Sequence, residues 1–250
     1  MRLSLVSRVV ITTATIASVL TAAAPALAGR AVAGRHDYAA TNHRISYSTS
    51  TNWSGYAVSG FGPYQSVSSS WQQPEVDCSK TPTAWSAFWV GLDGDTTSTV
   101  EQTGTEADCS KGTAVYYTWY EMYPNYPVNY ANPVSAGDSL SASVTYAGNG
   151  YFRLTLSDET RGWSHTTTQR LKSAKLGSAE VIAEAPSGSG GILPLADFGT
   201  AAFSGATVNG LELTASTPGL DPITKVSGST VSAVPSAISG GGFTDTWYSQ

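Results

Sequence analysis

The sequence is poor in charged residues, and basic residues are especially scarce. Its 250 residues include 13 Lys and Arg against 18 Asp and Glu, a formal net charge of −5. From residue 51 onward, 8 basic residues stand against 17 acidic ones, so 8 − 17 = −9. A protein that binds nucleic acid needs basic surface to contact the phosphates. We therefore expect no nucleic-acid partner, and few charges are compatible with work at low pH.

Cysteine and histidine are also rare, and this excludes several kinds of catalytic and metal site. Cys78 and Cys109 have no CxxC motif or histidine cluster beside them, so we expect no metal and no cofactor. Two cysteines in an exported protein pair by default, which predicts a Cys78–Cys109 disulfide. His165 is the one histidine after residue 50 and no GxSxG motif is present, so a serine triad is not expected.

The only long apolar run lies at the N-terminus. It extends from Val9 to about Ala24, follows two arginines and precedes Ala26-Leu27-Ala28, a small-x-small cleavage signal. This pattern is typical of a secretory signal peptide, residues 1–28. A membrane anchor is the alternative, but the run is diluted by Thr and Ala and shorter than the ~20 residues of a span. We expect a secreted, extracellular protein that does not bind membranes, with residues 29–50 as a linker or short pro-segment.

Amphipathic helical spacing is nearly absent after residue 50. Thr168–Glu180 is the one helix-like stretch, and Gly177 interrupts it. Short runs of Val, Thr, Tyr and Trp alternate instead with Gly, Pro, Asn and Asp, and Asn149-Gly150 predicts a hairpin. The sequence thus predicts an all-β fold, an antiparallel β-sandwich, as a single domain over residues 51–250. We expect a monomer.

Carboxylates and amides remain as candidates for chemistry. Glu121 lies among aromatic residues in "YTWYEMYP", and strand alternation puts Glu180 and Glu184 on one face with Ile182. A glutamate on an apolar face tends to have a raised pKa, which suits a general acid or base. Solvated carboxylates on an outer face are the alternative, and the residues alone favour it. Glu101 is expected to be such a solvated group.

Five motifs in order, "NWSGY", "FWVGLDGD", "VEQTG", "WYEMYP" and "AEVIAEAP", resemble the glutamic peptidases, the eqolisins of peptidase family G1. Each motif is weak alone, but the series is specific and covers Asn52 to Gln250. The short pro-segment resembles secreted bacterial members. The resemblance implies a jelly-roll or concanavalin-like sandwich of two packed seven-stranded sheets. It also implies a secreted acid endopeptidase that acts on polypeptides and is insensitive to pepstatin.

The resemblance also implies roles for particular residues. Gln102 and Glu184 correspond to the catalytic pair, and Glu180 is the second choice for the acid. Glu184 would be general base and then general acid on a bound water, while the Gln102 amide would stabilise the oxyanion. The groups implied to line the substrate cleft are Trp53, Trp89, Asp93 and Glu121. Tyr117 stands where an acid is expected in the family, and the cysteines do not match the positions of the fungal bridges.

Two other functions fit the same residues. A jelly-roll glycoside hydrolase also uses an aromatic groove and two glutamates, here Glu121 and Glu184. A catalytically inactive sandwich that binds peptide or carbohydrate is the non-enzymatic alternative. Fold alone does not decide between them.

Overall fold

The computed structural model describes residues 48–250, and these residues form an all-β fold without a helix. The predicted signal peptide and most of the predicted linker lie outside the described residues. No helix long and apolar enough to cross a membrane occurs in the described part of the chain. The strands are β1 Ser48–Ser50, β2 Trp53–Ser59, β3 Ser66–Gln72, β4 Ala87–Leu92, β5 Val100–Ser110, β6 Thr113–Tyr123, β7 Val128–Asn129, β8 Ser139–Gly148, β9 Tyr151–Asp158, β10 Trp163–Arg170, β11 Ser178–Glu184, β12 Ser187–Gly188, β13 Gly191–Ile192, β14 Thr200–Val208, β15 Leu211–Glu212, β16 Leu220–Ser227, β17 Thr230–Pro235 and β18 Phe243–Trp247.

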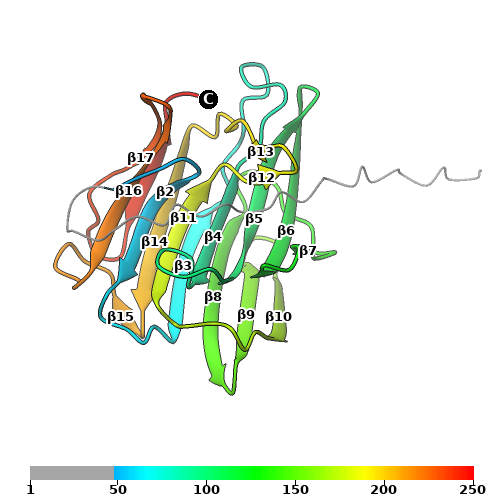
Figure 1. Cartoon of the computed structure of the whole chain (residues 1–250). Coiled ribbons are helices and arrows are strands. Elements are labelled where there is room, and N and C mark those ends of the chain that lie inside the picture. The colour runs from blue at the N-terminus through cyan, green and yellow to red at the C-terminus, as the bar shows by residue number, and fades with distance from the viewer. Residues whose placement is uncertain (1–47) are drawn as a thin grey trace, which may run out of the picture. The chain divides into compact units, whose positions relative to one another are not determined.

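The hydrogen-bonded strands form two series that pack face to face. Sheet I has the order β16-β2-β11-β4-β5-β6-β7, and sheet II has the order β10-β9-β8-β3-β14-β18-β17. The antiparallel pair β16–β17 joins them along one edge. Strands β4 and β5 of sheet I contact β8 and β9 of sheet II without pairing with them, as expected for stacked layers (Figure 1). The predicted all-β sandwich is confirmed.

Sheet I has buried apolar clusters on both faces, whereas the outer face of sheet II is polar. The side chains between the sheets include Phe88 and Val90 from sheet I and Leu154 from sheet II. A second apolar cluster lies on the other face of sheet I and contains Trp53, Ala57, Ala87, Trp89, Val100, Trp119, Ile182 and Ile223. We call this the outer face of sheet I. Strands β2, β4 and β11 are buried along their whole length.

The predicted disulfide is present. Cys78 and Cys109 are bonded, 31 residues apart in sequence. Cys109 lies near the end of β5 and pairs with Ala84 across an isolated bridge. The disulfide therefore ties the β3–β4 connection to the end of β5.

Two sequence-based expectations about local structure need correction. Ser48–Ser50 forms β1, which pairs in parallel with β16, so regular structure begins inside the segment predicted as a linker. The helix-like stretch Thr168–Glu180 contains the end of β10, a non-helical connection and the start of β11. Gly177, which interrupts that stretch, lies immediately before β11.

Candidate active site

Gln102 and Glu184 project from the outer face of sheet I. On β4, alternation puts Ala87, Trp89 and Gly91 on this face. Glu184 of β11 lies opposite Ala87, and Gln102 of β5 lies opposite Gly91. The two residues therefore flank β4 on one face, with a displacement of four positions along the strand.

Trp89 lies between Ala87 and Gly91 on β4 and is close to both Glu184 and Gln102. Its Nε1 donates a hydrogen bond of 2.8 Å to Glu184 Oε2. At its other end, a Cβ on Gly91 would lie 2.8 Å from Trp89 Cζ3 and 3.2 Å from Gln102 Cβ. A Cβ on Gly104, the glycine of "QTG", would lie 2.6 Å from Trp89 Cβ. The two glycines thus leave room for an indole that touches Glu184 and lies beside Gln102.

Both oxygens of the Glu184 carboxylate accept hydrogen bonds. Asn52 Nδ2 donates to Oε1 at 3.0 Å, while Trp89 holds Oε2. Asn52 is in turn held by Ser50, whose hydroxyl donates to Asn52 Oδ1 at 3.1 Å. Asn52 was not predicted as a site residue, although it opens the motif "NWSGY". Its position directly before β2 places its amide next to the end of β11.

Gln102 has a different direct partner. Its Nε2 donates to Glu121 Oε2 at 2.8 Å, and the two residues lie opposite each other on β5 and β6. A carboxylate only accepts hydrogen bonds, so this contact orients the amide, with its NH2 group toward Glu121. Gln102 Oε1 has no hydrogen-bond partner in residues 48–250. One N–H and the carbonyl oxygen of Gln102 therefore stay available.

Trp53 and Asp93 occupy different surroundings. The Trp53 ring packs edge-on against Trp89, with centroids 5.1 Å apart, so it belongs to the aromatic floor beside Glu184. Asp93 is fully buried and has a φ of 68°, and it binds the loop before β11. Its carboxylate accepts backbone N–H bonds from Lys175, Leu176 and Gly177 at 2.8, 3.0 and 2.7 Å. The contacts of Asp93 therefore position a loop.

The expectation of solvated carboxylates is wrong for this sheet. Glu121, Glu180 and Glu184 are fully buried. Glu180 of β11 and Gln102 of β5 both lie opposite Gly91 of β4, one on each side of it. Burial raises the pKa of Glu180 well above its ordinary range, and Asp95 and Asp93 raise it further.

Glu101 is also buried, contrary to the expectation from its position beside Gln102. It lies opposite Leu92 and Met122 on the inner face of β5, toward the sandwich core. Burial raises its pKa to about 9, and the nearby Asp93 adds to the shift. Alternation correctly separated Glu101 from Gln102, but both faces of this strand are covered.

A second pair of carboxyl groups, which the sequence analysis missed, lies beside Glu184. Glu106 of β5 faces Glu184 across Ala87, and burial, Asp108 and Glu184 together raise the pKa of Glu106 well above its ordinary range. Burial raises the pKa of Asp108 to about 7. The Tyr117 hydroxyl donates to Asp108 Oδ2 at 3.1 Å. The alternation Glu106-x-Asp108 after "QTG" was a signal for this pair.

The sequence model of the peptidase A4 family matches residues 51–247. The chain belongs to the peptidase A4 family. The fold agrees with that of solved glutamic peptidases. Scytalido-glutamic peptidase bound to a peptide-based transition state analogue is 24% identical, with a TM-score of 0.69 over 79% of this chain and 98% of that one. SCP-B, an eqolisin in complex with the tripeptide Ala-Ile-His, is 23% identical, with a TM-score of 0.65 over 79% and 98%.

Aspergilloglutamic peptidase from Aspergillus niger is 26% identical, with a TM-score of 0.58 over 66% of this chain and 99% of that one. No curated protein matches the sequence. Membership of the peptidase A4 family makes this chain a glutamic-type endopeptidase, a hydrolase with polypeptide substrates. The glycoside hydrolase alternative finds no support in these comparisons.

Proposed function

We propose that this peptidase A4 protein hydrolyses peptide bonds with Gln102 and Glu184, on a substrate that lies over Trp89. The observation that carries the proposal is the position of Trp89, whose indole bonds Glu184 at one end and lies beside Gln102 at the other. A carboxylate and an oriented amide on one face are the two groups that a water-mediated hydrolysis requires.

Glu184 performs the proton transfers in this mechanism. As a carboxylate it takes a proton from the attacking water, and as a carboxylic acid it returns that proton to the leaving amine. Asn52 and Trp89 bond its two oxygens and keep the carboxylate in one orientation. The same group therefore serves as base and then as acid without a second catalytic carboxylate.

Gln102 stabilises the tetrahedral intermediate. An amide does not titrate, so it cannot act as the base, but it can donate to the developing oxyanion. The Glu121 contact uses one N–H and orients the other, and the carbonyl oxygen remains for the water. One donor placed in this way contributes about 3 kcal/mol to the lowering of the barrier. Gln102 stands on β5, so the sheet fixes its position.

Glu106 and Asp108 set the charge around this pair. Because the pKa of Glu106 is raised, it stays a neutral acid at the side of Glu184. Two ionised carboxylates across Ala87 would repel each other. We assign Glu106 a positioning role, in which it limits the negative charge that the substrate meets.

The test uses protein recovered from the culture medium after expression of the full chain. We propose that residues 1–28 direct export, that a short pro-segment of the bacterial type follows and that the mature protein is a monomer. N-terminal sequencing should find a chain that begins after Ala28, whereas an N-terminus at Met1 would contradict processing. The recovered protein should cleave unfolded casein at acidic pH, with and without pepstatin, and should leave β-glucan intact. Inhibition by pepstatin or hydrolysis of the glucan would contradict the glutamic mechanism.

A further inference from the structure

Lys225 is a buried lysine on β16, in sheet I. It is 3% exposed, and no hydrogen bond or ion pair of its ammonium group occurs within residues 48–250. Strands β16, β2, β11, β4, β5 and β6 contain no other lysine or arginine. The ammonium nitrogen is not among the fully buried polar atoms that lack a partner, so it reaches open space, where a lone cation in an otherwise acidic sheet can bind an anion.

Lys225 lines a cavity of about 510 Å³. The lining includes the apolar segment Ile192–Leu195, which begins at the end of β13, and Val226–Gly228 at the end of β16. Thr51 and Gln250 complete the lining. The cavity thus combines one buried cation with apolar and neutral polar surroundings, where a charge-assisted contact is strong.

The cavity is next to the proposed catalytic carboxylate. Lys225 pairs with Ser50 of β1, and the Ser50 hydroxyl bonds Asn52, which donates to Glu184. Ile223 lies opposite Gly55, so Lys225 is level with Trp53, and Trp53 lies opposite Glu184. Neighbouring strands are about 4.8 Å apart, so the Lys225 and Glu184 backbones are about 10 Å apart.

We propose that Lys225 forms a substrate subsite that binds a carboxylate of the peptide, about three residues from the cleaved bond. An extended peptide advances about 3.3 Å per residue, so the ~10 Å between the Lys225 and Glu184 backbones corresponds to about three residues. The carboxylate is either a Glu or Asp side chain or the C-terminal carboxylate of a short peptide. The inference rests on the proposed function of Glu184, because it deepens the specificity of the same site.

The physical argument is that substrate supplies the counter-charge that the fold does not. Burial lowers the pKa of Lys225, which is the effect of a low-dielectric site on an unpaired ammonium. A carboxylate in the cavity stabilises the charged form and receives a short, charge-assisted hydrogen bond. A glutamine at the same peptide position is nearly the same size but lacks the charge.

The experiment measures cleavage of fluorogenic peptides that differ only by Glu or Gln at one position, scanned along the sequence. A second pair differs only by a free or an amidated C-terminus. At about pH 5.5 the peptide glutamate is ionised, since its ordinary pKa is about 4.3. The wild type should prefer the peptide with the carboxylate by about tenfold in kcat/KM at one position. Whether the Glu–Gln pair or the acid–amide pair shows the preference identifies the source of the carboxylate.

The variants separate this subsite from general damage. Lys225→Met should remove the preference and leave cleavage of the Gln peptide within about twofold, because a Met fits a buried apolar position. Lys225→Arg should keep the preference, and the exposed Lys172→Met is the matched control that should behave as wild type. A preference that survives in Lys225→Met, or a wild type without one at any position, would overturn the proposal.

A binding measurement distinguishes failure of the subsite from failure of the proposed mechanism. Fluorescence anisotropy with Glu184→Gln protein reports binding of the same peptides without turnover. Tighter binding of the carboxylate peptide that depends on Lys225 supports the subsite even if the wild type cleaves nothing. Equal binding of both peptides overturns the subsite even if the wild type is an active peptidase.

Discussion

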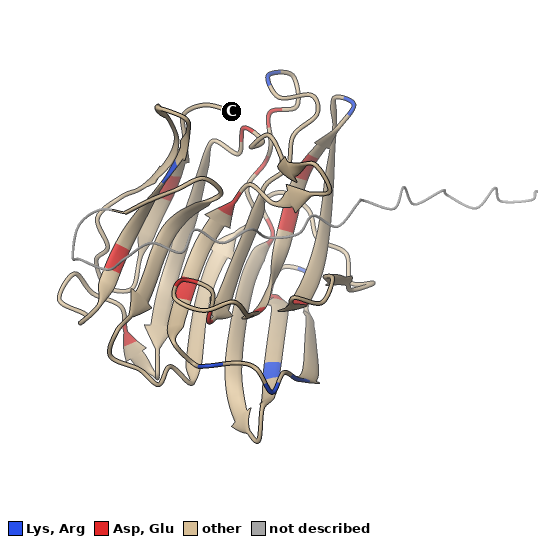
Figure 2. Cartoon of the chain, viewed as in Figure 1, with Lys and Arg blue, Asp and Glu red and all other residues tan. Residues whose placement is uncertain are grey.

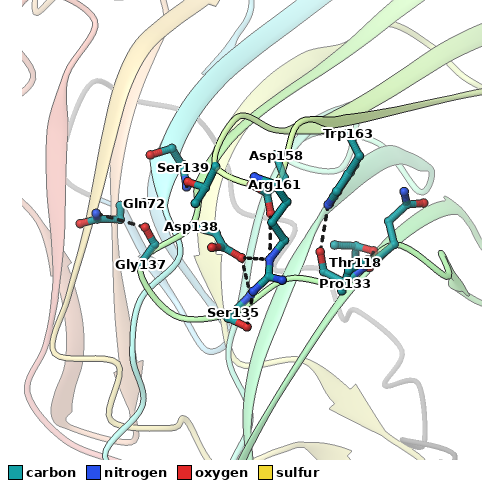
Figure 3. A network of polar contacts seen from close by, with 12 residues as sticks. Gln72, Thr118, Pro133, Ser135, Gly137, Asp138, Ser139, Asp158, Arg161 and Trp163 are labelled. Atoms are coloured by element: carbon teal, nitrogen blue, oxygen red, sulfur yellow. Dashed lines mark hydrogen bonds and ion pairs between the residues drawn. The ribbon is translucent and has the colours of Figure 1, made fainter.

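Sheet I and the β8–β10 end of sheet II both bury carboxyl groups, but they balance them differently. In sheet II, Arg161 donates to Asp138 and lies 3.7 Å from Asp158, and it also bonds the Ser135 hydroxyl at 2.7 Å (Figure 3). In sheet I, Glu101, Glu106 and Glu180 have no lysine or arginine partner within residues 48–250. Acidic residues lie both within strands and in loops, and basic residues lie mostly at loops and strand ends (Figure 2).

The pKa values of Asp138 and Glu101 follow this difference, whereas burial and the neighbouring Asp138 raise the pKa of Asp158. Burial raises the pKa of Asp138, but hydrogen bonds from Arg161 and the Ser135 backbone outweigh burial and leave it below its ordinary value. Burial acts without such opposition on Glu101, whose pKa rises to about 9. Paired charges therefore stabilise a turn in sheet II, whereas unpaired acids in sheet I remain able to exchange protons. A perturbed carboxyl in a covered sheet is a candidate for function.

The largest loss of activity is expected for substitutions in sheet I, compared with matched substitutions in sheet II. Glu184→Gln should lower kcat on casein by about 10³–10⁴-fold, because it removes the general base. Gln102→Ala should lower kcat by about 10²–10³-fold, because it removes an oxyanion donor. The exposed residues of sheet II and its connections offer controls, and Glu159→Gln and Gln72→Ala should retain wild-type rates. Circular dichroism should show an unchanged fold in all four, and wild-type activity of Glu184→Gln would refute its role.

The second prediction concerns how stability depends on pH. A carboxyl with a raised folded-state pKa favours the protonated fold, so its contribution is present below the unfolded pKa and is lost as pH rises. For Asp108 this contribution is lost as the pH rises from 3.8 to about 7, and for Glu101 as it rises from 4.5 to about 9. The Tm should therefore fall as the pH rises from acid into this range.

Glu101→Gln is the variant that tests this pH effect. Its amide resembles the protonated acid, so the substitution should raise the Tm at about pH 8 and change it little at about pH 4. Differential scanning calorimetry across this range measures both. A Tm that rises steadily from pH 4 to pH 8 in the wild type would contradict the burial of unpaired acids as the dominant effect.

The smallest expected effect is in sheet II and has the opposite pH dependence. Arg161→Met leaves Asp138 and Asp158 buried without their cation, so the Tm should fall by several degrees at neutral pH. The pKa of Asp138 is lowered, so its pairing with Arg161 stabilises the fold above pH 3.8. This stabilisation is lost as the pH falls through the pKa of Asp138 in the folded protein. The penalty of Arg161→Met should thus shrink in acid. Arg153→Met, an exposed change on β9, is the control, and casein cleavage per folded molecule should stay unchanged.

Much of the fold could be predicted from the sequence, because strand alternation and turn residues are local. The hairpin at Asn149-Gly150, the sandwich and the Cys78–Cys109 disulfide are all present. The helix-like spacing of Thr168–Glu180 was only a weak signal, because Gly177 interrupts it. Asn52 and Glu106 could not be predicted as neighbours of Glu184, because strand register depends on pairs far apart in sequence.

Strand alternation was enough to predict which residues share a strand face: Glu180 with Glu184, and Gln102 apart from Glu101. Period-two alternation is a property of the extended backbone and needs no partner strand. What lies opposite each face depends on how the strands pair and the sheets pack. Glu101, expected in solvent, lies against the core, and Gln102 meets Glu121 directly while Trp89 lies beside it and bonds Glu184. Register and layer packing join distant segments, and that information is absent from any single stretch of sequence.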